Sequence, residues 1–110
     1  MLYDVIPSTG DPLVIGLIVA AFALGSIPFG VLLARARGVD LKKVGSGNIG
    51  ATNAARALGK KIGVVVLLLD TAKAYLPTAA ALWLRLGSNV AAATALAAFV
   101  GHIYSPWLKG

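Results

Sequence analysis

The sequence predicts an all-α integral membrane protein with three transmembrane helices, and with a polar, glycine-rich loop and a short helix between the first and the second. Two observations carry this prediction. Hydrophobic residues make up 58% of the 110 residues and charged residues only 13%, whereas soluble domains average about 25% charged. The apolar residues also form long Ala- and Leu-rich runs without alternation, which favours helices over strands. We expect one membrane domain spanning residues 1–110.

The first predicted span covers about residues 12–36 and contains 23 consecutive uncharged residues, 12–34. A hydrocarbon core needs about 20 apolar residues. A cleavable signal sequence is the alternative, but the preceding segment carries Asp4 and Asp11 rather than Lys or Arg. The apolar run also exceeds a usual signal core. We therefore expect a retained helix.

The second and third spans are predicted at about residues 62–85 and 87–108. The second is apolar except for Asp70 and Lys73. These two lie three residues apart on one helix face, where mutual neutralisation is the simplest interpretation and a role in a substrate path is the rival. Gly16, Gly25 and Gly30 are expected to allow close helix packing.

Orientation follows from the basic residues. Seven of the ten Lys and Arg residues fall between Arg35 and Lys61. Basic loops stay cytoplasmic, so we expect the loop at about residues 37–61 in the cytoplasm and the N-terminus outside. If the chain crosses the membrane three times, the end of the third span, with His102 and Lys109, lies on the same cytoplasmic side as this loop.

The composition also argues against several function classes. The net charge of +6 is concentrated in a loop without interleaved aromatic residues, so we expect no nucleic-acid partner. The chain has no cysteine, one histidine and four acidic residues, widely spread. We therefore predict no disulfide and no metal site.

The loop contains the motif VGSGNIGATNAAR at residues 44–56. A dinucleotide site is rejected because no buried strand precedes the glycines. The physics of anion binding still applies, since glycines let backbone N–H groups turn towards a phosphate. A short helix is expected next, with Thr52 or Asn53 near its start and Gly59 near its end. Thr52 and Arg56 would share a face. A plain connector is the alternative.

Here the sequence resembles a known family. The segments LGSIPFG (24–30), GVDLKKVGSGNIGATN (38–53) with its continuation to Lys61, and GHIYSPWLKG (101–110) are similar to the bacterial acyl-phosphate:glycerol-3-phosphate acyltransferases in order and spacing. The resemblance implies a multi-pass enzyme of the bacterial inner membrane. It would transfer a fatty acyl group from acyl phosphate to the 1-hydroxyl of glycerol 3-phosphate, giving lysophosphatidic acid and phosphate. No cofactor is implied.

The resemblance also implies roles for individual residues. Ser46 and Arg56 match the family motif, Ser46 as a hydrogen-bonding residue and Arg56 as a phosphate clamp, and His102 falls in the second motif. His102 could bind phosphate or relay a proton, or simply pack at a helix end. The remaining predicted contacts to substrate or phosphate come from the loop and the C-terminus: Gly45, Gly47, Asn48, Gly50, Thr52, Asn53 and Lys109. Direct transfer is preferred over an acyl-Ser46 intermediate, because no base lies nearby in sequence.

The chain resembles only the N-terminal half of this family. The later spans and a third motif have no counterpart in it, so we expect the 110 residues alone to be inactive and a C-terminal half to be a partner. Two other classes stay open. One is a small membrane transporter or channel subunit for an anion, and the other is a non-catalytic membrane scaffold.

Overall fold

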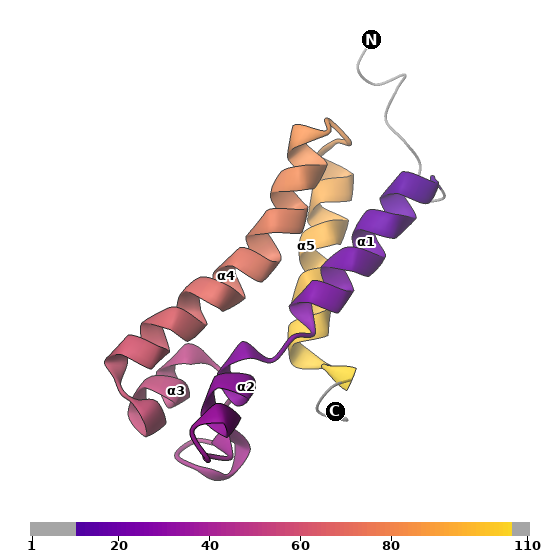
Figure 1. Ribbon diagram of the computed structural model, residues 1–110. Helices are drawn as coiled ribbons and strands as arrows, with labels where there is room; N and C mark the ends of the chain where they lie inside the picture. The colour runs from indigo at the N-terminus through magenta and orange to yellow at the C-terminus, as the bar shows by residue number, and fades with distance from the viewer. Residues whose placement is uncertain (1–10, 107–110) are drawn as a thin grey trace. The chain divides into compact units, whose positions relative to one another are not determined.

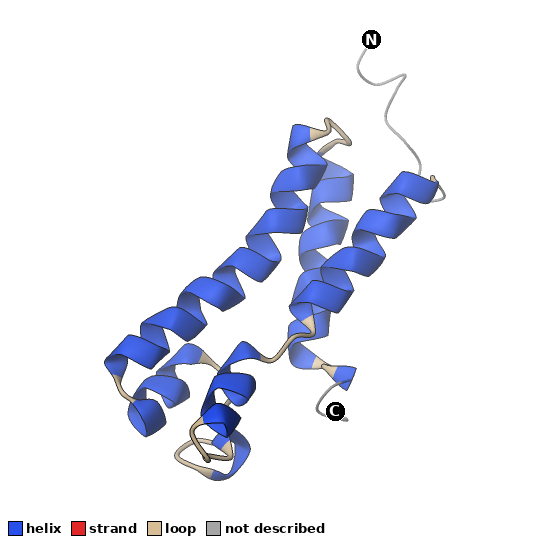
Figure 2. Ribbon diagram, viewed as in Figure 1, coloured by secondary structure: helices blue, strands red, loops and turns tan. Residues whose placement is uncertain are grey.

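A computed structural model of the protein describes residues 11–106, and every regular element in this range is a helix (Figures 1 and 2). In chain order these are α1 (Pro12–Gly25), α2 (Phe29–Ala36), the 3₁₀ helix η2 (Leu41–Lys43), α3 (Ala51–Leu58), α4 (Lys60–Trp83) and α5 (Ser88–Ile103). The all-α prediction is therefore confirmed for residues 11–106.

The first predicted span is not one continuous helix. α1 runs from Pro12 to Gly25 and is capped by Asp11, whose carboxylate accepts a hydrogen bond from the Leu13 N–H at 2.8 Å. α2 begins only at Phe29. Pro28 lacks an N–H and its ring disfavours helical backbone in the residue before it, so the helix breaks at residues 26–28. The predicted span therefore contains a break, although residues 12–36 remain long and apolar enough to cross a membrane.

By length and composition, two stretches of the described chain could cross a membrane, Pro12–Ala36 and Lys60–Trp83. α5 is apolar but has only 16 residues, which corresponds to about 24 Å of helix. The hydrocarbon core is about 30 Å thick. The third crossing therefore stays a prediction.

The described residues form two compact units, and α4 contributes to both. One unit comprises residues 11–27 and 73–106. In it α1 packs along α5, as Figure 1 shows. Its buried apolar cluster consists of Val14, Ala81, Leu86, Val90 and Ala91. Gly25 and Gly101 sit where the two backbones meet, because a Cβ on either would collide with backbone atoms of the other helix.

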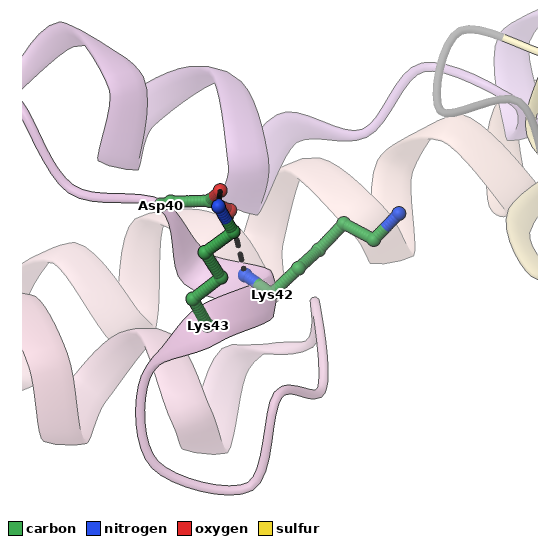
Figure 3. Close-up of polar contacts among 3 residues, drawn as sticks. All are labelled: Asp40, Lys42 and Lys43. Atoms are coloured by element: carbon green, nitrogen blue, oxygen red, sulfur yellow. Dashed lines mark hydrogen bonds and ion pairs between the residues drawn. The ribbon is translucent and has the colours of Figure 1, made fainter.

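The second unit is Pro28–Ala72 and holds the glycine-rich loop. Its buried side chains include Val31, Leu41 and Val66. The Asp40 carboxylate caps η2 by accepting a hydrogen bond from the Lys42 N–H at 3.2 Å (Figure 3). Lys43 Nζ lies 3.9 Å from the same carboxylate. Both side chains are well exposed, so this ion pair adds little stability.

Candidate functional site

The glycine-rich loop, residues 44–50, folds around the side chain of Asn53. Asn53 is only 2% exposed. Its Nδ2 donates to the carbonyl oxygens of Leu41 at 3.2 Å, Val44 at 3.0 Å and Asn48 at 2.8 Å. Its Oδ1 accepts from the Ser46 N–H at 3.2 Å. One buried amide therefore ties together both ends of the loop, and removing it would leave buried carbonyls unsatisfied at about 1–3 kcal/mol each.

Two glycines of the motif are required by this geometry. Gly45 and Gly47 have positive φ values of 54° and 74°, a region that costs other residues roughly 1–2 kcal/mol. A Cβ at Gly45 would also collide with Asn53 Oδ1, and one at Gly47 would lie 2.9 Å from the Lys42 carbonyl oxygen. Gly50 is extended, with φ −82°, and precedes α3. Among the three glycines of the motif, positive φ therefore occurs at the first two.

The loop differs from the expected open cradle of backbone N–H groups. Besides the Ser46 N–H, the Gly47 N–H donates to the Val44 carbonyl at 2.9 Å, the Asn48 N–H to Ser46 Oγ at 3.3 Å and the Gly50 N–H to Asn48 Oδ1 at 2.8 Å. These four donors stabilise the loop itself. Ser46 Oγ accepts here, and a hydroxyl can still donate its own proton.

A cleft of about 590 Å³ lies between α3 and α4. Its walls are apolar, from Ala51, Ala55, Val64 and Leu67, and the polar side chains lining it are Thr52, Arg56 and Lys60. The prediction that Thr52 and Arg56 share a face is confirmed. Because two cations meet an apolar surface here, this cleft suits an amphiphilic anion.

Gly63 brings the walls of this cleft together. A Cβ at Gly63 would lie 3.0 Å from Ala55 Cα and 3.2 Å from the Ala51 carbonyl oxygen. Sequence reasoning missed Gly63 and Lys60. Their spacing with Val64 and Leu67 (60, 63, 64, 67) is that of one helix face, which could have identified them once Arg56 was chosen.

His102 lies in the last turn of α5, in the other unit. Its Nδ1 is 3.0 Å from Lys73 Nζ, and Lys73 is only 5% exposed. Lys109 lies outside the described residues. The approach of His102 and Lys109 to the glycine loop, and mutual neutralisation of Asp70 and Lys73, stay predictions.

Apolar helices long enough to cross a membrane, and a cleft that combines apolar walls with two cationic side chains, are typical of an integral membrane protein. Residues 15–110 match the glycerol-3-phosphate acyltransferase family, and the chain belongs to that family. The resemblance seen in the sequence is thereby confirmed.

Relatives and solved structures agree. The chain is 58% identical over 97 residues to the glycerol-3-phosphate acyltransferase of Anaeromyxobacter sp. (strain Fw109-5), covering 84% of this chain and 48% of that protein. It is 50% identical over 93 residues to that of Geotalea daltonii, with the same coverage. A crystal structure of PlsY, an integral membrane glycerol 3-phosphate acyltransferase in its glycerol 3-phosphate form, superposes with a TM-score of 0.83 at 46% identity, covering 86% of this chain and 48% of that one. The chain thus spans about half the length of the curated relatives it matches.

Proposed function

We propose that this chain carries the acyl-donor half of a site that transfers a fatty acyl group from acyl phosphate to the 1-hydroxyl of glycerol 3-phosphate. The products are lysophosphatidic acid and inorganic phosphate. The observation that carries this proposal is the α3–α4 cleft, in a member of the glycerol-3-phosphate acyltransferase family, with apolar walls beside Arg56 and Lys60. The proposed setting is the bacterial cytoplasmic membrane, with the loop on the cytoplasmic side.

In this proposal the two parts of the donor meet different parts of the cleft. The acyl chain lies against Val64 and Leu67, which removes it from water. The phosphate lies at Arg56, whose guanidinium can hold two phosphate oxygens at once, with Thr52 one turn away on the same face. Lys60 adds a second positive charge. Ser46, on the neighbouring loop, is proposed to hydrogen-bond the substrate.

The reaction needs no cofactor. The donor is a mixed anhydride, so the bond between the acyl carbon and the phosphate oxygen breaks as the glycerol oxygen bonds to that carbon. The hydroxyl proton leaves with the departing phosphate. Arg56 neutralises the charge that grows on this phosphate, and positioning supplies much of the remaining rate.

Direct transfer is favoured over an acyl-Ser46 intermediate. The contact of Ser46 Oγ is with the Asn48 N–H, a hydrogen-bond donor. A donor cannot take the hydroxyl proton, as activation of a serine nucleophile requires. The other half of the family-length protein is proposed to bind glycerol 3-phosphate together with this chain.

The test is an acyl-transfer assay on a chimera in which this chain replaces the matching half of PlsY. We expect lysophosphatidic acid and phosphate in equal amounts, only when acyl phosphate and glycerol 3-phosphate are both present. Acyl-coenzyme A should not replace the donor, and the 110-residue chain alone should give no product. A folded chimera that uses acyl-coenzyme A equally well, or that moves an anion without forming product, would contradict the proposal.

A further inference from the structure

A buried lysine contacts both the break between α1 and α2 and the single histidine of the chain. Lys73 lies on α4 and is 5% exposed. Its Nζ donates to the carbonyl oxygen of Ile27 at 2.8 Å and lies 3.0 Å from His102 Nδ1. All three residues belong to the same compact unit.

The break between α1 and α2 needs such donors. Residues 26–28 lie outside both helices, so the carbonyls of Ser26 and Ile27 are not part of a continuous helical ladder. In a membrane, freed backbone groups of this kind must find partners within the protein. Ser105 Oγ donates to the Ser26 carbonyl and Lys73 Nζ to that of Ile27. Both donors are buried side chains, so the break is a supported feature of the fold.

The same ammonium constrains the imidazole. A lysine ammonium has three protons and no lone pair, so it can only donate. Nδ1 of His102 must then present its lone pair, which places the ring proton on Nε2.

We propose that Lys73 is a positioning residue that fixes the tautomer of His102 with the ring proton on Nε2 and links this ring to the helix break at Ile27. Nε2–H is then the donor that His102 offers to other groups. Any effect of this arrangement on acyl transfer rests on the proposed function. The tautomer of His102 and the hydrogen bond from Lys73 to Ile27 do not depend on that function.

The experiment is nitrogen NMR of the full chain in lipid nanodiscs with ¹⁵N-labelled histidine. The chain has one histidine, so every ring signal belongs to His102. We expect an Nε2 signal with an attached proton and an Nδ1 signal shifted as for a hydrogen-bond acceptor. In Lys73→Met the Nδ1 signal should move to the position of an acceptor without a donor, and Lys73→Arg should restore most of the original position.

Lys61→Met is the matched control, since it makes the same change at an exposed position of the same helix. It should leave both ring signals unchanged. A wild-type spectrum with the proton on Nδ1 would overturn the proposal even if Lys73→Met fails to fold. So would a folded Lys73→Met chain whose ring signals stay in place. Neither result depends on acyl transfer, so a failure here is distinct from a failure of the proposed function.

Discussion

Replacing Arg56 with alanine in the chimera is expected to lower kcat/KM for acyl transfer by about 100-fold or more. Arg56 lines the cleft beside Thr52 and Lys60, where its guanidinium can make two charge-assisted hydrogen bonds to the donor phosphate. The phosphate gains charge as it leaves, so the loss should be larger in the transition state than in the bound donor. Initial rates over a range of acyl phosphate concentrations measure it.

Two variants sharpen this prediction. Arg56→Lys keeps the charge but loses the planar two-point contact, so its rate should fall between wild type and alanine. Arg37→Ala removes the same charge at an exposed position that does not line the cleft, and it should keep near-full activity. If Arg37→Ala and Arg56→Ala lower kcat/KM equally, the loss reflects the overall positive charge of the protein and not a phosphate clamp at Arg56.

Replacing Gly101 with valine is expected to disrupt the packing of α1 on α5. A Cβ at Gly101 would collide with the Phe22 carbonyl oxygen and lie 2.9 Å from the Ser26 amide nitrogen. Both are backbone atoms and cannot rotate away, so the helices would have to separate. Overpacking typically costs 1–3 kcal/mol and occasionally more, and we expect about 3 kcal/mol here. Thermal unfolding in detergent should show a clearly lower midpoint.

Gly16→Val is the matched control. Gly16 lies on α1, and nothing stands within 4 Å of a Cβ built there. Its unfolding midpoint should stay close to that of the wild type. If both variants unfold at the same temperature, close approach at Gly101 does not stabilise the α1–α5 pair.

These glycines show what the sequence could and could not predict about the fold. Continuous apolar runs correctly predicted helices, and α4 begins and ends two residues before the predicted span, at Lys60 and Trp83. The C-cap at Gly59 was also predicted, and its φ of 100° explains the glycine. The prediction that Gly25 packs closely is confirmed, whereas no atom of the described residues lies within 4 Å of a Cβ built at Gly16. Hydropathy does not give the rotation of a helix about its axis, which decides which glycine meets a neighbour.

Hydropathy alone also does not show how the break in the first span is supported. Hydropathy averaged over a window is high throughout residues 12–34. It does not register that Pro28 lacks the N–H that a continuous helix requires. The hydrogen-bonding partners of the break are also remote in sequence, since Lys73 is 46 residues from Ile27 and Ser105 is 79 from Ser26. No local pattern predicts such contacts.

The local structure around the candidate site was predicted, but its hydrogen bonds were not. The motif correctly located the loop, the short helix and the shared face of Thr52 and Arg56. Asn53 was expected to contact substrate, yet its amide is committed to the loop, including the Leu41 carbonyl 12 residues away. We now propose that Asn53 shapes the loop. Substrate contacts from Ser46, Asn48 and His102 stay predictions.

The most direct test of the account is where an anionic lipid binds on this chain. The chain in nanodiscs would be labelled with a non-hydrolysable acyl phosphonate, an analogue of the acyl donor, that carries a photoreactive group on its acyl chain close to the carbonyl. The labelled peptides would be identified by mass spectrometry. We predict labelling at residues 60–67, reduced by Arg56→Ala and by Leu67→Trp. Leu76→Trp, which adds the same bulk at an exposed position of α4 that does not line the cleft, should have no effect. Uniform labelling of the apolar helices, or equal labelling by an uncharged acyl ester with the same chain and photoreactive group, would contradict an anionic acyl-donor site in the α3–α4 cleft.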